Sequence, residues 1–305
     1  MRRHRLRWLA AVLVTLSACG GTTTTTVGSI AAGGGDPSAF PVVVRGVTIP
    51  TLPQRIVSGS ATHTEILFGL GAGPKVIATD DFSDYPVEAA SLPHFDAFNP
   101  SVEGIAGMDP DLVILAFDPG DVAAGLDALG IPTIVFDAPA TLEDAYRQFE
   151  EVGTATGFAG QGRQLATTTR AEVERLTAGL AELTDPLTYY HELDATFFSI
   201  GSDTFLGSIY GLVGLASIAD AAGGGYPQLS AEFIVSADPE FIFLGDADCC
   251  GENAETVAAR PGWGSLRAVT TGRVIAVDEA LSSRWGPRLV ELVRFLVDTV
   301  GGEEG

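Results

Sequence analysis

The sequence predicts an α/β protein of two α/β lobes, each with a central and mostly parallel sheet, joined by one long helix. The first observation is a repeat, because residues 101–115 and 230–244 both follow the pattern SxExIxxxDP[DE]x[VI]xL. The second is an amphipathic stripe that predicts a long helix over residues 160–184, midway between the two copies. The third is an alternation of short apolar strands with helices, which is typical of buried parallel sheets.

Length and charge limit the possible functions. A chain of 305 residues is long enough for two lobes, each of roughly 130 residues with a core of its own. Its formal net charge of −22 repels phosphate backbones, so we expect no nucleic-acid partner. The same charge disfavours strongly anionic ligands. We expect a monomer.

The first residues predict export. Residues 1–18 contain four arginines followed by a short apolar run, the pattern of a signal peptide. The run ends at Leu16-Ser17-Ala18-Cys19, which resembles a bacterial lipobox with Cys19 as the lipidated residue. The alternative is ordinary signal cleavage beside an incidental cysteine. Residues 19–39 are rich in Thr and Gly and predict a lipidated flexible tether. We therefore expect an extracytoplasmic protein, held by its lipid on the outer face of the cell membrane, or a periplasmic one.

The predicted domains are an N-terminal lobe over residues 40–140, linking helices over 141–185 and a C-terminal lobe over 186–305. The first lobe is expected to hold a hairpin over 42–49 and strands over 55–58, 75–79, 112–116 and 133–136, with helices over 101–108 and 121–129. A capping box at Thr62–Glu65 predicts the start of its first helix. A helix over 142–156 then leads into the long helix. The second lobe is expected to hold strands over 187–190, 241–244 and 274–277, with helices over 204–213, 254–259 and from about 287.

No motif of a nucleophile, a phosphate loop or a zinc protease is present, so we do not expect an enzyme. The histidines are scattered, and a structural role is favoured for each, although His63 in a helix start could line a cleft. The acidic loop of Asp80, Asp81, Asp84 and Glu88 fits a solvated surface better than a cation site. Cys249-Cys250 is open to three interpretations, which are a vicinal disulfide, two free thiols or pairing between chains. Neither the histidines nor the cysteines receive a metal or ligand role.

Aromatic residues are the better indication of a site. They fall mostly in loops predicted at strand ends, which form the ligand crevice of α/β sheets. Taken singly, each is more often a core residue, but as a group drawn from both lobes they predict an aromatic-walled cleft between the lobes. The group consists of Phe82, Tyr85, Phe95, Phe98, Phe197, Phe198, Tyr226 and Trp285.

Short motifs along residues 40–300 resemble the periplasmic binding proteins for ferric siderophores, haem and cobalamin. They are Pro53-Gln-Arg-Ile-Val-Ser, Thr64-Glu-Ile-Leu-Phe-Gly-Leu-Gly-Ala-Gly, Asp84-Tyr-Pro, Asn99-Pro-Ser-Val-Glu, Asp109-Pro-Asp-Leu-Val, Ser230-Ala-Glu and Gly286-Pro-Arg-Leu-Val. The resemblance implies two lobes bridged by a helix, a ligand cleft between them, and a substrate-binding lipoprotein that delivers its ligand to an ABC importer permease.

By position, the resemblance implies ligand contacts at Phe82, Phe98, Phe198, Tyr226, Arg284 and Trp285. It also implies that Glu103 and Glu232 dock on permease arginines. Haem binders commonly carry a ligating tyrosine near position 97 or 98, where Ala97 and Phe98 stand, so haem is the least favoured ligand unless His63 or His94 serves instead. A ferric siderophore of the neutral hydroxamate type or a corrinoid such as cobalamin is expected, before an anionic catecholate.

Three other classes compete with this interpretation. A zinc- or manganese-binding lipoprotein of a metal ABC importer shares the helix-linked design but needs three or four converging His, Asp or Glu ligands. An extracellular hydrolase needs a nucleophile with a base. A sensory or adhesive lipoprotein does not account for the paired glutamates.

Overall fold

The computed structural model describes residues 34–180 and 186–301. The predicted signal peptide, Cys19 and most of the predicted tether lie outside these residues. The described residues belong to one compact unit. None of its helices is long and apolar enough to cross a membrane within the described ranges.

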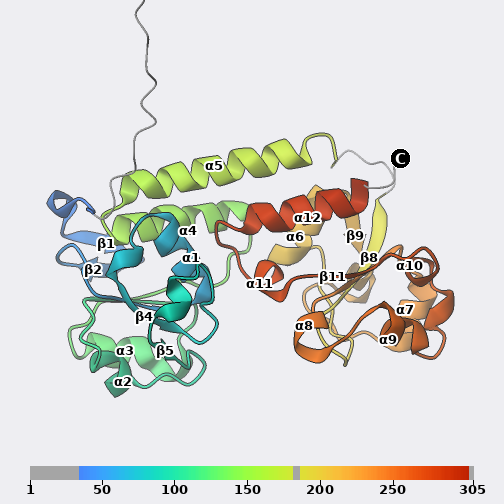
Figure 1. Ribbon diagram of the computed structural model, residues 1–305, viewed down its shortest axis with the longest axis horizontal. Helices are drawn as coiled ribbons and strands as arrows, with labels where there is room; N and C mark the ends of the chain where they lie inside the picture. Colours follow the sequence, from blue (N-terminus) through green and yellow to red (C-terminus); the bar gives the residue numbers. More distant parts are fainter. Residues whose placement is uncertain (1–33, 181–185, 302–305) are drawn as a thin grey trace, which may run out of the picture. The chain divides into compact units, whose positions relative to one another are not determined.

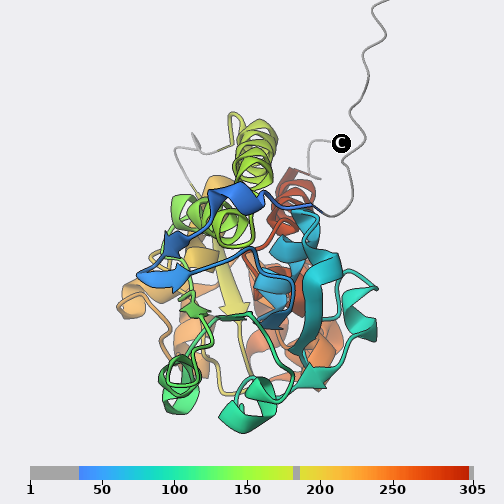
Figure 2. The ribbon, with the colours of Figure 1, turned by 90° about the vertical axis from the view of Figure 1, so that its left-hand side faces the viewer.

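The first lobe is built on a parallel sheet of five strands in the order β5-β4-β3-β6-β7 (Figure 1). These strands are β3 (Ile56–Gly59), β4 (Val76–Asp80), β5 (His94–Phe95), β6 (Leu112–Leu115) and β7 (Thr133–Val135). The connections contain α1 (Ala61–Gly69), α2 (Val102–Ala106) and α3 (Val122–Asp127). An antiparallel hairpin of β1 (Val42–Val44) and β2 (Val47–Ile49) precedes the sheet and faces the viewer in Figure 2.

The second lobe repeats this plan with four parallel strands in the order β11-β10-β8-β9. They are β8 (Leu187–Glu192), β9 (Leu215–Ser217), β10 (Phe241–Leu244) and β11 (Val274–Ala276). Its helices are α6 (Phe205–Leu212), α7 (Ala231–Ala237), α8 (Ala247–Cys250), α9 (Ala254–Ala259), α10 (Arg267–Thr270), α11 (Glu279–Ser282) and α12 (Leu289–Gly301). The predicted α/β class and the parallel sheets are therefore confirmed, while β5 and β9 were not foreseen because each has only two or three residues.

Alternation along the strands separates the core into layers. In the first lobe Val57 and Val113 point to the side covered by α2 and α3, whereas Ile56 and Leu112 point to the side of α1 and α4. In the second lobe Tyr190 and Ile242 pack beneath α7 and α9. Tyr189 and Phe243 face the opposite way, toward α6 and α12.

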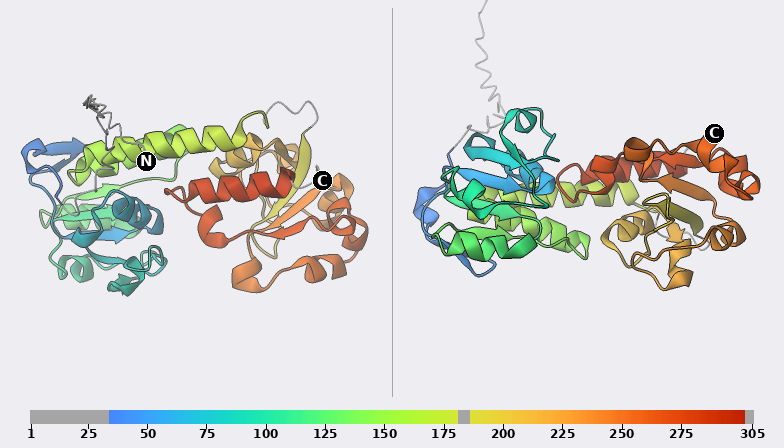
Figure 3. Two further views of the ribbon diagram at one scale, coloured as in Figure 1. Left: turned by 45° about the horizontal axis from the view of Figure 1, so that its top comes forward. Right: turned by 90° about the horizontal axis from the view of Figure 1, so that it is seen from below.

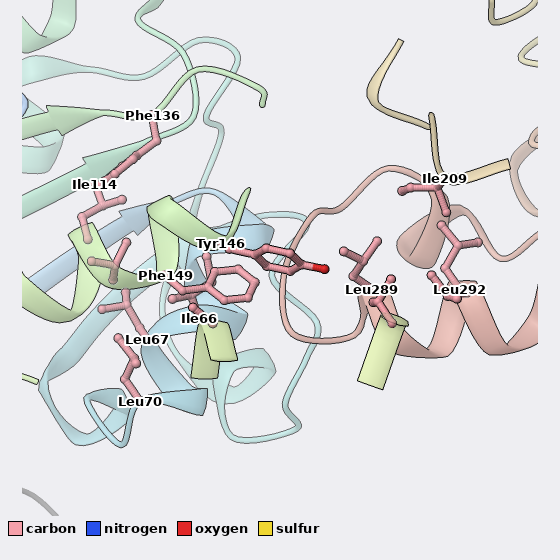
Figure 4. Packing of buried hydrophobic residues seen from close by; sticks show 14 of the residues in the cluster. Ile66, Leu67, Leu70, Ile114, Phe136, Tyr146, Phe149, Ile209, Leu289 and Leu292 are labelled. Atoms are coloured by element: carbon pink, nitrogen blue, oxygen red, sulfur yellow. The ribbon is translucent and has the colours of Figure 1, made fainter. Parts of the chain in front are cut away.

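Two long helices, α4 (Leu142–Ala155) and α5 (Ala159–Thr177), connect the lobes, and α5 packs on both α4 and α12 (Figures 1 and 3). One buried apolar cluster contains residues of both lobes and of these helices. Figure 4 shows Ile66, Tyr146 and Phe149 on one side of the cluster and Ile209 and Leu289 on the other. The expected helix to residue 184 is too long, because α5 ends at Thr177 and Gly179 adopts a left-handed conformation at φ 83°.

The repeat appears as the same local structure in both lobes. Ser101 caps α2 by accepting from the Gly104 amide, and Ser230 caps α7 by accepting from the Phe233 amide. Asp109 and Asp238, at the same repeat position, both have positive φ, at 55° and 45°. Aspartate tolerates this region better than most residues, which suits the turn from each helix into β6 or β10.

The predicted capping box at Thr62–Glu65 is wrong. Ser60 is the N-cap of α1 and its hydroxyl accepts from the His63 amide, so Thr62 and Glu65 lie inside the helix. Both of these side chains are buried. The predicted start is two residues too late, because Ser60 follows the strand directly and already caps the helix.

Candidate ligand cleft

A cavity of about 610 Å³ lies at the carboxyl ends of strands from both lobes. Residues after β3, β4 and β6 line it from the first lobe, and residues after β10 and β11 line it from the second. Parallel sheets place ligand crevices at this end, because the loops that follow the strands meet there. The position of the cavity is therefore the one expected for the predicted cleft between the lobes.

Three phenylalanines form an aromatic wall on the first-lobe side of the cavity. The Phe98 ring lies 5.6 Å from Phe82 and 5.3 Å from Phe117, measured between ring centroids. Phe82 and Phe98 are 54% and 64% exposed, which is unusual for neighbouring large apolar side chains on a protein surface. Such a patch is typical of a site that a ligand or a partner covers.

The rest of the cavity is acidic. Of its lining residues, only Arg284 is basic, whereas six carry carboxylates: Asp80, Asp81, Asp84, Asp248, Asp278 and Glu279. Burial raises the pKa of Asp80, against hydrogen bonds from Ser83 and the backbone that lower it. The cavity therefore repels an anionic ligand and suits a neutral or cationic one with an apolar face.

Arg284 is held by the protein itself. Its guanidinium donates to Asp84 at 2.7 Å, to Glu65 at 3.0 Å and to the Phe82 carbonyl at 2.9 Å. The Arg284 side chain is 10% exposed and that of Glu65 only 1%. Through these three bonds from Nη1 and Nη2, Arg284 positions the loop of Phe82 and joins the segment before α12 to the first lobe.

Trp285 and His63 meet behind the cavity at Gln148. The Trp285 indole donates to Gln148 Oε1 at 2.7 Å, and His63 Nε2 lies 3.1 Å from the same oxygen. His63 Nδ1 is 2.8 Å from the Ser60 hydroxyl. His63 is fully buried rather than facing the cavity. The suggestion that it lines a cleft, or ligates haem there, is therefore wrong, because both ring nitrogens are engaged.

Stability at acid pH should report this burial. Desolvation lowers the pKa of His63 to about 3 in the folded state, whereas in the unfolded chain the imidazole takes up a proton near pH 6.5. Stability contributed by neutral His63 is complete above pH 6.5 and is lost as the pH falls toward 3. Between pH 7 and pH 5 this linkage amounts to about 2 kcal/mol. Urea unfolding at both pH values should show that loss in the wild type and a smaller one in His63→Gln, and equal losses would contradict the linkage.

Comparison with known proteins identifies the family. Residues 56–281 match the family model described as periplasmic binding protein. The chain belongs to the periplasmic binding protein family. This family includes substrate-binding proteins of ABC importers for cobalamin, haem and iron or its siderophores, and it is non-catalytic. This periplasmic binding protein is accordingly the substrate-binding component of an ABC importer.

Individual relatives span nearly the whole chain. An uncharacterized ABC transporter substrate-binding lipoprotein, YvrC of Bacillus subtilis, is 28% identical over 317 residues and covers 98% of each chain. A cobalamin-binding protein of Halobacterium salinarum is 28% identical, with 94% of this chain and 83% of its own covered. The structure of the periplasmic haem-binding protein RhuT from Roseiflexus is also similar, with a TM-score of 0.74 at 26% identity, covering 81% and 97% of the two chains.

Not every expected ligand residue of this periplasmic binding protein lines the cavity. Phe82, Phe98, Arg284 and Trp285 do. Phe198 and Tyr226 are exposed on the second lobe but are not among the lining residues. Phe198 instead pairs with Gln228 in an isolated antiparallel bridge.

The cavity also contains residues that the sequence analysis did not single out. Phe117, Asp248 and Asp278 follow β6, β10 and β11 within a few residues. The same strand-end rule that selected Phe82 would have found them. No family motif covers these three positions, so only the strand-end rule marks them.

Glu103 and Glu232 occupy equivalent places on α2 and α7, each over the corresponding face of its sheet. Both are exposed. Neither is used in a salt bridge within the described residues, and Glu103 accepts only from its neighbour Ser101 at 3.2 Å. The two carboxylates are thus available to a partner, as the docking prediction requires.

Cys249 and Cys250 are joined in a vicinal disulfide within the short helix α8. Among residues 34–180 and 186–301, no group of three or more His, Cys, Asp or Glu side chains is placed to hold a metal ion.

Proposed function

We propose that this protein captures a neutral or cationic metal chelate, a corrinoid of the cobalamin type in particular, and delivers it to the permease of its importer. The aromatic wall facing an acidic cavity carries the proposal. A corrinoid offers a broad apolar face to Phe82, Phe98 and Phe117, and it brings no carboxylates into a cavity lined by six of them. The cobalamin-binding relative supports the same choice.

A ferric siderophore of the neutral hydroxamate type is the second candidate, since it meets the same charge requirement. Haem and ferric catecholates are disfavoured because their carboxylates or negative charges would enter the acidic cavity beside an arginine that is already paired. We further propose that Phe198 and Tyr226 contact the ligand from the second lobe.

A binding panel tests the proposal. Trp285 lies at the cavity and should report binding through its fluorescence. Cyanocobalamin should quench it at micromolar concentration or below, a neutral ferric trihydroxamate more weakly, and ferric enterobactin, haemin and zinc ions not at all. Tight binding of haemin or of the catecholate with no response to cyanocobalamin would reject the proposed ligand class.

Removal of the aromatic wall should weaken binding without unfolding the protein. Phe98→Ala removes an exposed ring that meets Phe82 edge to face and Phe117 at a tilt, so it should cost little stability. Its cyanocobalamin affinity should fall about tenfold or more, as expected for a stacked aromatic contact plus its buried area. Leu129→Ala is the matched control, because Leu129 is a comparably exposed apolar residue outside the cavity. Equal affinities of the two variants, measured by titration calorimetry, would remove Phe98 from the site.

We also propose that Cys19 anchors the mature protein to the membrane through a lipid, as the similarity to the lipoprotein YvrC suggests. Cys19→Ala should abolish lipid attachment, so that radiolabelled palmitate no longer enters the protein and the protein leaves the membrane fraction. Unchanged labelling of the variant would show that Cys19 is not the modified residue.

A further inference from the structure

The end of strand β10 leads directly into the second-lobe wall of the ligand cleft. The Gly245 amide donates to the Glu192 carbonyl at 2.8 Å and continues the pairing of β10 with β8. Asp246 follows, and after it comes helix α8, whose Asp248 lines the cleft. Asp246 therefore lies at the junction between the sheet and a short helix that carries a cleft residue.

The Asp246 side chain is buried without a partner. The residue is 1% exposed, and neither carboxylate oxygen has a hydrogen bond to another described residue. Such groups are rare in folded proteins, because nothing compensates the hydration that they lose. Asp248, two residues further along, is exposed instead. An aspartate in the position of Asp246 is costly as a carboxylate and much less so as a neutral acid.

The charges around Asp246 add to this cost. The ionisable groups that face it in the described chain are Tyr190 and Glu192 on β8, Glu252 after α8 and Arg260 after α9. Arg260 donates to both carboxylate oxygens of Glu192, at 2.5 and 2.6 Å, and to Glu252 at 2.8 Å. The Tyr190 hydroxyl also donates to Glu192, at 3.1 Å. Arg260 is thus engaged by two other carboxylates, and an ionised Asp246 adds a third negative charge beside it.

The pKa of Asp246 follows from these surroundings. Burial raises it to about 6, Glu192 and Glu252 act in the same direction, and the backbone amide of Asp246 and Arg260 oppose the rise. The ordinary value is 3.8, so a proton stabilises the buried position of the side chain. That stabilisation is complete below pH 3.8 and is lost as the pH rises through 6. Each further pH unit shifts the balance about tenfold toward a conformation in which Asp246 reaches water.

Few contacts hold helix α8 on the lobe. Its backbone bonds run within the turn, from the Cys250 amide to the Asp246 carbonyl at 3.1 Å and from the Gly251 amide to the Ala247 carbonyl at 3.0 Å. Ala247 packs against the apolar cluster beneath α7 and α9, whereas residues 248–250 are exposed. Segments with so little buried apolar surface open locally while the sheet stays folded.

We propose that Asp246 is a positioning residue for the ligand cleft. With its carboxyl neutral, it stays buried and holds α8 against the lobe. With its carboxyl ionised, it turns to water and releases α8 together with Asp248. The second-lobe wall of the cleft is therefore in place at mildly acid pH and loosens at higher pH. The effect on binding rests on the proposed function, but the movement of α8 does not.

Hydrogen exchange of the ligand-free protein tests the movement. The peptide containing residues 246–252 is followed by mass spectrometry from pH 5 to pH 8, with each rate divided by the intrinsic rate at that pH. Its protection should fall about tenfold or more between pH 6 and pH 8 in the wild type. It should stay constant in Asp246→Asn, which mimics the neutral acid. Asp298→Asn, which neutralises an exposed acid on α12, should behave as the wild type. Constant protection in the wild type overturns the proposal.

The titration of Asp246 gives a readout that does not depend on the folding of any variant. Its carboxyl carbon, followed by NMR in the wild type, should titrate with a midpoint near pH 6. A midpoint near the ordinary 3.8 overturns the proposal, because Asp246 would then be ionised throughout the range in which α8 is expected to move.

Binding shows whether the movement matters to the cleft. At pH 7.5 the wild type should bind cyanocobalamin about threefold or more weakly than Asp246→Asn, and the difference should shrink as the pH falls to 5. Asp80, whose pKa is also raised, is present in both proteins and so drops out of this comparison. Equal affinities at both pH values overturn the positioning role. A complete lack of cyanocobalamin binding rejects the proposed ligand instead, and hydrogen exchange then still decides whether Asp246 moves α8.

Discussion

Reversing both Glu103 and Glu232 to arginine should abolish uptake through the importer while leaving ligand binding by the isolated protein nearly unchanged. Both side chains are exposed, and neither lines the ligand cleft. Their helices are equivalent members of the two lobes, so the pair presents one carboxylate per lobe. Such a pair suits a two-fold permease with one arginine pocket per subunit, because arginine–carboxylate pairing is bidentate and geometrically selective.

The double variant could contradict the docking role in two ways, by transporting normally or by losing its ligand. The alternative explanation is purely structural: each glutamate lies in the first turn of its helix, where its charge interacts favourably with the helix dipole and stabilises the helix by about 0.3–1 kcal/mol. Under that explanation the double variant would lose a little stability and still transport cyanocobalamin. Single reversals should reduce uptake, and an arginine-to-glutamate change in the permease pocket should partly restore it. Loss of cyanocobalamin binding by the purified double variant would show instead that the fold or the cleft had been damaged.

The fold was largely predictable from local signals. The two SxExI copies predicted matching helices and strands because a serine cap and a buried apolar strand leave strong marks in the sequence. Strand β9 and strand β5 left weak marks, since three and two residues carry little periodicity. The true start of α1 at Ser60 was obscured by a second, more typical capping pattern inside the helix.

The site was predictable only in part. Phe82 and Phe98 were singled out because they are aromatic residues in loops predicted at strand ends and match cleft positions of the family. The engagement of Arg284 by Glu65 and Asp84, by contrast, spans about two hundred residues of sequence. No local pattern records such a contact. The same holds for His63, whose Nε2 contacts Gln148 of a helix 85 residues further along the chain. Residue type predicts which side chains could contact a ligand. Tertiary packing decides which of them are engaged by other residues of the protein and which stay exposed in the cavity.

Arg284→Ala should therefore behave as the loss of a buried ion pair rather than of a ligand contact. The substitution leaves Glu65, with 1% of its side chain exposed, only the more distant Arg288 at 3.6 Å. Breaking such a pair typically destabilises a protein by about 3–5 kcal/mol. Release of Asp84 and of the Phe82 carbonyl also frees the loop of the aromatic wall, so affinity for cyanocobalamin should fall as well.

Arg267→Ala is the matched control for this variant. Arg267 also donates to two carboxylates and a carbonyl, those of Asp238 and Glu240 and the Asp238 backbone, but its side chain is 53% exposed. Its loss should cost less than about 1 kcal/mol in urea unfolding at pH 7, as exposed pairs do. If the two variants lose equal stability, the contribution of Arg284 to stability does not come from its burial.

The stability that Arg284→Ala loses should depend on pH. This dependence distinguishes an unpaired buried charge from a simple loss of packing. Burial raises the pKa of Glu65, and the arginine at position 284 opposes that rise. Without Arg284 the pKa of Glu65 should move further above its unfolded value of 4.5, so the folded variant takes up a proton on acidification that the unfolded chain does not. A proton taken up only by the folded state stabilises it, and this stabilisation is lost as the pH rises through the folded pKa. The stability difference between wild type and Arg284→Ala should therefore shrink between pH 7 and pH 5, whereas a packing defect would keep it constant.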